Sequence, residues 1–377
     1  MKKHKVLTII GTRPEAIKLA PVIMQLERRS DHFLSKVCVT AQHRGMLDQV
    51  LKIFNINPDY DLDIMLPGQT LAQVTSQAIE GIDRVIKGMN PDLVFIQGDT
   101  TTAFCGALAA FYHKVKVCHV EAGLRTENKF APFPEEINRR LVSTLTDYHF
   151  APTERAKRSL MRENIAPSSI FVTGNTAIDA LIWVKNRVCN EKSELPFSLA
   201  ETLNGHLMVL VTGHRRESFG EGFENICIAI SEVADAFPDA VFIYPVHLNP
   251  NVREPVNRIL GGHNQIHLIE PLSYTTFVWL MDRATVVLTD SGGVQEEAPS
   301  LGKPVLVMRE TTERPEGIEV GNARLVGVKK ENIVNALTDL LKHPEKREAM
   351  AKVNNPYGDG HAAERIINIL EKALGGN

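Results

Sequence analysis

Residues 290–297, with the sequence DSGGVQEE, combine the groups that bind a phosphate. They follow the apolar run 285–288, so we predict a strand, a glycine turn and a helix start. Free N–H groups at a helix start bind anions, and Gly292 and Gly293 allow close backbone approach. Ser291 adds a hydroxyl, and Glu297, about one turn on, can accept the hydroxyls of a ribose diol. Two glycines alone would indicate only a turn, but the position at a strand's carboxyl end favours a ligand site.

A second glycine turn, IGTRPE at residues 10–15, follows the first apolar run. Pro14 suits the first position of a helix. Arg13 would then lie at the helix mouth, where an anion would bind, and Lys18 lies one turn further on. A capped helix with cations facing solvent is an equally good interpretation of this motif alone.

Acidic residues follow predicted strands or a stiff loop at three places in the first half of the chain. Asp99, in QGDTTT, is by itself best explained as a helix N-cap. Glu121 follows the carboxyl end of a predicted buried strand. Burying a carboxylate there costs free energy unless it is paired or functional. Glu135 and Glu136 follow the loop FAPFP, and acidic residues are ordinary in a first helical turn. Each is a candidate acid or base, and none is decisive alone.

His214 is the corresponding candidate in the second half, in the segment TGHRRE that follows the apolar run 207–211. It could act as a general acid or donate to a phosphate oxygen. A single histidine is usually structural, but the neighbouring arginines and the strand end favour function. His247 has a similar position with weaker support, and Arg314 is a further candidate cation.

The elements that must position these residues alternate along the chain as short apolar runs and helical stretches, which predicts parallel sheets with crossover helices. A chain of 377 residues is too long for one ordinary core, so we expect two α/β domains. The predicted strands are 6–10, 36–40, 93–97, 116–120, 148–151 and 170–173, then 207–212, 240–244, 266–269, 285–288 and 304–307. Residues 189–205 are predicted to connect the two domains. A last helix, 362–374, follows the helix-breaking sequence NNP.

Composition excludes several classes of protein. The balance of 42 basic and 45 acidic residues, without a basic stripe, argues against a nucleic-acid partner. No apolar stretch reaches the length of a membrane span, and the N-terminus lacks the apolar region of a signal peptide. Five cysteines without paired spacing suit a reducing compartment, so we expect a cytoplasmic protein.

None of the possible cofactor-binding motifs has the sequence context that it requires. GDGHAA at residues 358–363 fits the dinucleotide pattern, but a proline-broken loop precedes it where a strand is required. No P-loop occurs, and the pair His263 and His267 lacks a third metal ligand nearby. We therefore predict neither a metal nor a redox cofactor.

Seven motifs occur in an order that is similar to one family, the bacterial non-hydrolysing UDP-N-acetylglucosamine 2-epimerases. They are GTRPEAIK (11–18), GDTTT (98–102), HVEAGLRT (119–126), PEE (134–136), TGHRRE (212–217), DSGGVQEEAPSLG (290–302) and NPYGDG (355–360). The resemblance implies a GT-B-type fold with parallel sheets facing a central cleft. It assigns 1–188 and 189–360 to two Rossmann-like domains, returns helix 361–377 to the first, and implies a homodimer.

The resemblance also implies the reaction, interconversion of UDP-N-acetylglucosamine and UDP-N-acetylmannosamine. The hydrogen at C2 is not acidic, so elimination of UDP to 2-acetamidoglucal and re-addition is a workable route without NAD. By motif match, Asp99, Glu121 and Glu135 are the acid/base carboxylates and His214 an essential partner near the phosphates. The implied substrate-binding residues are Arg13, Lys18, Phe277, Ser291, Gly292, Gly293, Glu297 and Arg314.

Gln42, Arg215 and His247 match a second, allosteric UDP-N-acetylglucosamine site of the family. Some relatives have Gln at the position of Gly45 and Arg at that of Gly68, so activation does not follow from the match. Three other functions stay open: a GT-B glycosyltransferase, which needs an acceptor pocket; a catalytically silent UDP-sugar sensor; and a hydrolysing 2-epimerase, which often carries a fused kinase domain.

Overall fold

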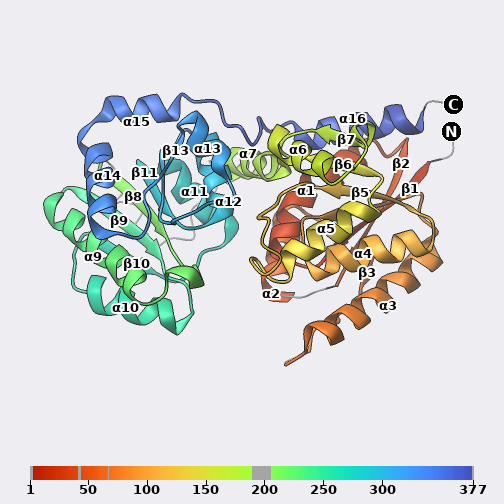
Figure 1. The fold of residues 1–377 in the computed structure, drawn as a ribbon, viewed down its shortest axis with the longest axis horizontal. Coiled ribbons are helices and arrows are strands. Elements are labelled where there is room, and N and C mark those ends of the chain that lie inside the picture. Colours follow the sequence, from red (N-terminus) through yellow and green to blue (C-terminus); the bar gives the residue numbers. More distant parts are fainter. Residues whose placement is uncertain (1–2, 41–43, 67, 189–204, 376–377) are drawn as a thin grey trace. The chain divides into compact units, whose positions relative to one another are not determined.

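The computed structural model describes residues 3–40, 44–66, 68–188 and 205–375. Contacts divide the chain into two compact units (Figure 1). Unit 1 comprises Met1–Ala180 and Tyr357–Asn377, and unit 2 comprises Leu181–Pro356. Each unit is built on one parallel sheet, which confirms the prediction of two Rossmann-like α/β domains.

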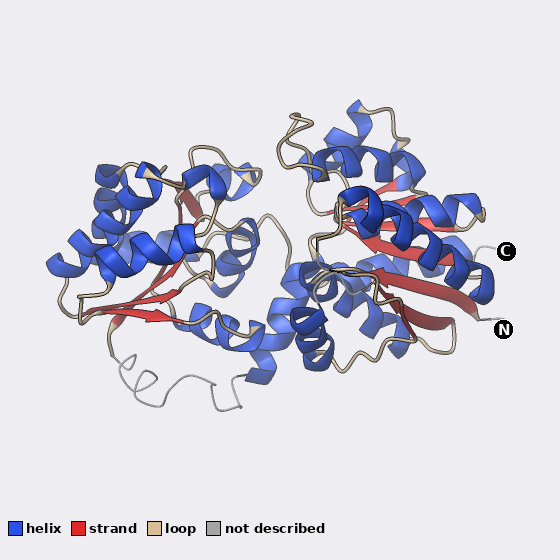
Figure 2. Ribbon diagram, turned by 90° about the horizontal axis from the view of Figure 1, so that it is seen from below, coloured by secondary structure: helices blue, strands red, loops and turns tan. Residues whose placement is uncertain are grey.

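The sheet of unit 1 has seven strands in the order β3-β2-β1-β4-β5-β6-β7. Continuous apolar runs form its central strands because helices cover both faces, and their side chains are almost fully buried (Figure 2). The strands are β1 (His4–Ile10), β2 (Phe33–Val39), β3 (Tyr60–Asp61), β4 (Leu93–Gln97), β5 (Lys116–Val120), β6 (Tyr148–Ala151) and β7 (Ile170–Val172).

The helices of unit 1 connect successive strands, and the last helix of the chain joins them. They are α1 (Arg13–Arg28), α2 (Arg44–Ile53), α3 (Leu71–Met89), α4 (Thr101–Tyr112), α5 (Glu135–Leu145), α6 (Glu154–Arg162) and α16 (Ala362–Leu374). α7 (Thr176–Val188) runs across the division between the units. Helix α16 packs on α1, where Arg29 Nη2 donates to Asn368 Oδ1 over 2.7 Å. Asp179 accepts hydrogen bonds from the N–H groups of Ala362 and Ala363 at the start of α16.

The sheet of unit 2 has six strands in the order β10-β9-β8-β11-β12-β13. The strands are β8 (Leu207–Thr212), β9 (Ala240–Pro245), β10 (Ile266–Ile269), β11 (Val286–Thr289), β12 (Val305–Val307) and β13 (Ala323–Leu325). The helices are α9 (Glu221–Ala236), α10 (Pro250–Leu260), α11 (Tyr274–Arg283), α12 (Gly292–Glu297), α13 (Pro315–Val320), α14 (Lys330–Lys342) and α15 (Pro344–Ala351). Buried side chains of α9, α14 and the central strands form its core.

Two strands were not predicted from the sequence, β3 and β13. Both lie at the edge of a sheet, have only two and three residues, and contain a charged residue, Asp61 in β3 and Arg324 in β13, so neither forms an apolar run. None of the helices in the described part of the chain is long and apolar enough to cross a membrane.

Candidate functional site

The turn after β1 is tied to the turn after β4 by a buried carboxylate. Glu15, in the first turn of α1, accepts a hydrogen bond from Gly11 N over 3.1 Å and one from Thr100 Oγ1 over 2.8 Å. Burial raises the pKa of Glu15 to about 7, despite these hydrogen bonds, which favour the charged form. The connection fixes Arg13, on the first turn, relative to Asp99, on the second.

Asp99 follows β4 and is held from several sides. Its Oδ2 accepts from Arg139 Nε and lies 2.8 Å from Arg139 Nη2. Its backbone carbonyl accepts from Asn138 Nδ2, and the carbonyl of Gly98 lies 2.8 Å from His119 Nε2. The N-cap interpretation of Asp99 was wrong, because the Thr100 side chain accepts the hydrogen bond at the start of α4. The carboxylate of Asp99 pairs with Arg139 instead of capping α4.

Glu121 follows β5, the strand next to β4, and has a left-handed backbone with φ 64°. That conformation is unfavourable for a residue with a side chain, and such strain is often found at functional sites. Its carboxylate accepts from Gln97 Nε2 over 3.2 Å and from Asn175 Nδ2 over 2.9 Å. It also pairs with the ammonium of Lys18, the predicted substrate-binding cation. Three donors from three separate segments hold one carboxylate at the end of the sheet.

The start of α5 contributes two glutamates with different surroundings. Glu135 has a buried Oε2 that accepts no hydrogen bond from the described residues. Glu136 is fully buried and accepts from Thr126 N over 3.0 Å and from Glu127 N over 3.2 Å. Its Oε2 also lies 3.0 Å from Arg139 Nη1.

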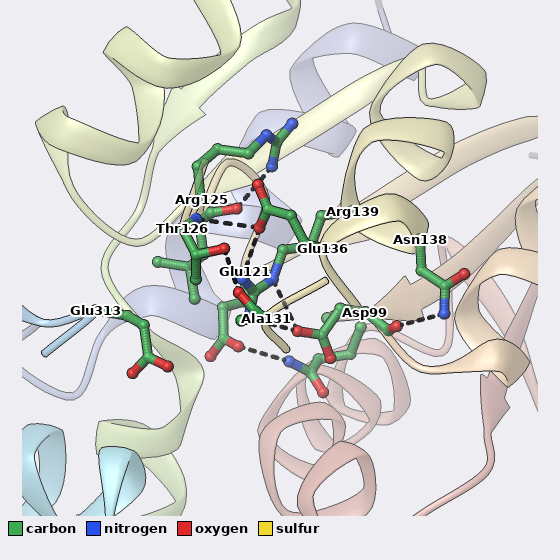
Figure 3. A network of polar contacts seen from close by, with 12 residues as sticks. Asp99, Glu121, Arg125, Thr126, Ala131, Glu136, Asn138, Arg139 and Glu313 are labelled. Carbon is green, nitrogen blue, oxygen red and sulfur yellow. Dashed lines mark hydrogen bonds and ion pairs between the residues drawn. The ribbon is translucent and has the colours of Figure 1, made fainter. Parts of the chain in front are cut away.

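Arg139 therefore lies between two carboxylates, those of Asp99 and Glu136 (Figure 3). Figure 3 shows Glu121 beside this cluster. Sequence reasoning singled out neither Arg139 nor Glu136 as a positioning residue. The contact between Arg139 and Asp99 spans 40 positions in the chain, so no local pattern could have indicated it.

In unit 2 the predicted phosphate-binding turn, residues 291–293, follows β11, and it is called the phosphate turn below. Ser291 is the N-cap residue of α12, and its side chain makes no capping hydrogen bond. A Cβ on Gly292 would meet the guanidinium carbon of Arg314 at 2.9 Å, whereas a Cβ on Gly293 would meet nothing within 4 Å. Glu297, at the end of α12, is buried and accepts from Tyr274 Oη over 3.2 Å. The turn thus has one closely packed glycine and one that faces open space.

Arg314 is fixed beside this turn by two carboxylates. Its Nε donates to Glu296 Oε1 over 2.7 Å, and its Nη1 lies 3.3 Å from Glu313 Oε2. Burial alone would raise the pKa of Glu313, but the hydrogen bond from Arg309 and the charge of Arg314 lower it to about 2. Phe277, the predicted uracil contact, is half-buried on α11.

His214 follows β8, the strand next to β11. Its N–H and that of Arg215 donate to Asp290 Oδ2 over 2.7 and 2.8 Å. The imidazole stacks on that of His247, with ring centroids 5.2 Å apart. Arg215 and His247 belong to the predicted allosteric set, and Gln42, its third member, lies outside the described residues.

The structure thus groups the predicted residues by unit. Unit 1 contributes Arg13, Lys18, Asp99, Glu121 and Glu135, around the ends of β1, β4 and β5. Unit 2 contributes Phe277, the phosphate turn, Glu297, Arg314 and His214, around the ends of β8 and β11. The predicted acid/base groups and the predicted phosphate ligands both lie at the carboxyl ends of parallel strands, where α/β sheets bind ligands.

A family model and several relatives of high sequence identity identify one family. The sequence model of the family described as UDP-N-acetylglucosamine 2-epimerase matches residues 25–371. UDP-N-acetylglucosamine 2-epimerase of Escherichia coli K12 is 55% identical over 370 residues, covering 97% of this chain and 98% of its own. The enzyme of that name from Bacillus subtilis is 51% identical, covering 98% and 96%.

Solved structures agree with the sequence comparison. UDP-GlcNAc 2-epimerase from Neisseria meningitidis, bound to UDP-GlcNAc, has a TM-score of 0.89 at 48% identity, covering 98% of this chain and all of its own. The Methanocaldococcus jannaschii enzyme in complex with UDP-GlcNAc and UDP has a TM-score of 0.79 at 35% identity, covering 97% and 99%. These matches confirm the predicted GT-B-type class of fold. The chain belongs to the UDP-N-acetylglucosamine 2-epimerase family.

Proposed function

We propose that the protein interconverts UDP-N-acetylglucosamine and UDP-N-acetylmannosamine. The observation that carries this proposal is the environment of Glu121, a carboxylate with a strained backbone that is held by Lys18, Gln97 and Asn175. A fixed carboxylate beside a second one, Asp99, is suited to moving a proton on a bound sugar. The ligands of the Neisseria and Methanocaldococcus relatives, UDP-GlcNAc and UDP, support the choice of substrate.

The reaction proceeds by elimination and re-addition. A base removes the C2 proton while the C1–O bond to UDP breaks, and the electron pair of the C2–H bond forms the double bond of 2-acetamidoglucal. UDP then adds back at C1, and a proton is delivered to the opposite face of C2. Asp99, Glu121 and Glu135 are the proposed acid/base groups. Removal and delivery on opposite faces require at least two proton-transfer groups, which is why a set of carboxylates is needed.

The phosphate turn holds the leaving group. Ser291, Gly292 and Gly293 bind the diphosphate, and Arg314 offsets the negative charge that grows on UDP as the C1–O bond breaks. An interaction that strengthens as the bond breaks accelerates the reaction, whereas uniform binding does not. Glu297 binds the ribose, Phe277 lies near the uracil, Arg13 and Lys18 are further substrate-binding cations, and His214 acts near the phosphates.

Turnover in D₂O tests the proposal. Incubation of the protein with UDP-N-acetylglucosamine is expected to yield both epimers with deuterium at C2, measured by proton NMR and mass spectrometry. Epimers without solvent deuterium would contradict the elimination route. A UDP-sugar that binds and is never converted would instead indicate a sensor.

A Glu121→Gln variant sharpens this experiment. The amide keeps the shape of the side chain but cannot take the C2 proton, so turnover is expected to fall by about 100-fold or more. UDP binding, measured by calorimetry, is expected to persist because the phosphate turn is unchanged. Near-normal deuterium incorporation in this variant would remove Glu121 from the set of acid/base groups.

A further inference from the structure

Asp290 connects the phosphate turn with the turn that carries His214. It is fully buried, and it lies between Thr289, the last residue of β11, and Ser291. Its Oδ2 accepts from the backbone N–H groups of His214 and Arg215, over 2.7 and 2.8 Å. The two turns follow neighbouring strands, since Thr289 pairs with Thr212 across the sheet. One carboxylate oxygen therefore fixes the backbone of the His214 turn.

The second oxygen of the same carboxylate faces the imidazole. Oδ1 of Asp290 lies 3.6 Å from Nδ1 of His214, and it accepts no hydrogen bond from any described residue. The imidazole side chain is 42% exposed, so a ligand can reach it, whereas the carboxylate is not exposed at all. A buried acceptor without a donor is costly unless a neighbouring group supplies one, and Nδ1–H of His214, 3.6 Å away, is such a group.

We propose that Asp290 is a positioning residue that holds His214 with its Nδ1 protonated toward the carboxylate and its Nε2 directed at the substrate diphosphate. This inference rests on the proposed function, in which UDP departs from C1. An imidazolium held in this way donates a hydrogen bond from Nε2 to a phosphate oxygen as negative charge grows there, and keeps its Nδ1 proton throughout. The protonation of one ring nitrogen of a histidine is set by the hydrogen bond that the other makes.

The charged groups around His214 act in opposite directions on its protonation. Burial lowers the pKa of His214, and the nearby His247 and Arg215 lower it as well. The negative charge of Asp290 raises it, so Asp290 is the group that favours the imidazolium. Removing this charge is expected to lower the pKa of His214 further.

The test is an Asp290→Asn variant examined by ¹⁵N NMR of histidine side chains, with a His214→Gln sample to assign the signals. The amide oxygen can still accept the two backbone N–H groups, but the amide NH₂ would face Nδ1. In the wild type, neutral His214 is expected to carry its proton on Nδ1; in the variant the proton is expected on Nε2, at a lower pKa. The kcat for UDP-N-acetylglucosamine is expected to fall by about 100-fold or more, with a smaller change in KM.

Asp235→Asn is the matched control, because Asp235 is an exposed aspartate on α9 that lies 3.3 Å from Nδ1 of another histidine, His263. It is expected to alter the signals of His263 and to leave kcat and the His214 signals unchanged.

A wild-type His214 protonated on Nε2, or the same tautomer and pKa of His214 in the wild type and in Asp290→Asn, would overturn the inference. If Asp290→Asn does not fold, the wild-type tautomer alone decides. A tautomer that depends on Asp290 in a protein without epimerase activity would contradict the proposed function and support the positioning of His214.

Discussion

At the scale of single residues, this fold places carboxylates where burial alone would exclude them. Glu136 and Asp290 are fully buried and accept backbone N–H groups. Glu15 is buried too, but its hydrogen bonds do not offset the cost of desolvation, and its pKa rises to about 7. The first two hold turns in place by accepting backbone hydrogen bonds. Glu15, by contrast, gains a proton within the physiological range of pH.

Replacing Glu15 with Gln is expected to stabilise the protein increasingly as pH rises. The folded state holds a proton on Glu15 up to about pH 7, while the unfolded chain releases it near the ordinary glutamate pKa of 4.5. The wild type therefore loses stability between these values, and the loss is complete above the folded pKa. The difference of about 2.5 pH units corresponds to at most about 3 kcal/mol.

The measurement is the difference in melting temperature between Glu15→Gln and the wild type at pH 5, 6, 7 and 8. The difference is expected to shift in favour of the variant as pH rises. Glu154→Gln, a change of an exposed glutamate on α6, is the control and is expected to show no such trend. A constant difference for Glu15→Gln would mean that Glu15 is ionised throughout.

At the scale of elements, the short helix α12 says most about how the predicted phosphate site is built. Its first residue, Gly292, packs against the guanidinium of Arg314, and its second, Gly293, faces open space. A side chain at position 292 would therefore clash with the protein itself. A side chain at position 293 would clash only with a bound ligand. The guanidinium is itself held by Glu296 and Glu313. A side chain at position 292 could therefore displace it only by breaking these ion pairs.

Gly293→Ala is expected to leave the melting temperature unchanged or slightly raised, because alanine is favoured over glycine in a helix by about 1 kcal/mol. The same change is expected to weaken UDP binding at least about 10-fold, since the methyl group would occupy the space that the phosphate needs. Gly292→Ala, the matched variant, is expected to lower the melting temperature as well. Calorimetry with UDP and thermal unfolding without it measure the two effects. Unaltered UDP affinity in Gly293→Ala would contradict the assignment of the phosphate turn.

The sequence predicts the central elements well and the contacts between them poorly. Buried parallel strands such as β4 and β5 are continuous apolar runs that a sequence shows directly, while the edge strands β3 and β13 are short and interrupted by a charged residue. Asp99 was a candidate from its position after a strand, yet its partner Arg139 lies 40 positions away. Asp290 was inside a recognised motif, but its role depends on the pairing of β11 with β8. Such roles follow from tertiary neighbours and not from local pattern.

At the scale of the whole molecule, the exposed surface of unit 1 predicts self-association. Phe111 and Tyr112, at the end of α4, and Ile137 and Leu141, on α5, are large apolar side chains that face solvent, and the two helices pack together. Exposed apolar patches often mark an interface with another protein, and the packing of α4 on α5 puts these four side chains on adjoining helices. The family resemblance independently implies a homodimer, so we expect a second copy of the chain to cover this surface.

Light scattering coupled to gel filtration is expected to give twice the mass of one chain for the wild type at micromolar concentration. Phe111→Glu is expected to shift the population toward the monomer, because the new charge would have to be buried in the interface. Ile228→Glu changes a comparably exposed residue on α9 of unit 2 and is expected to leave the mass unchanged. A monomeric wild type would contradict the prediction, and a dimeric Phe111→Glu would place the interface elsewhere.

The return of α16 to unit 1 affects the order in which the chain can fold during its synthesis. Unit 2 is continuous in sequence, whereas unit 1 is completed only by residues after 356. On the ribosome, all of unit 2 is therefore made before α16, and the surface of α1 that this helix covers stays open until then. The buried side chains Ile366, Ile367 and Leu370 reach unit 1 only after all of unit 2 has been made. A nascent chain of this protein can thus complete its second unit before its first.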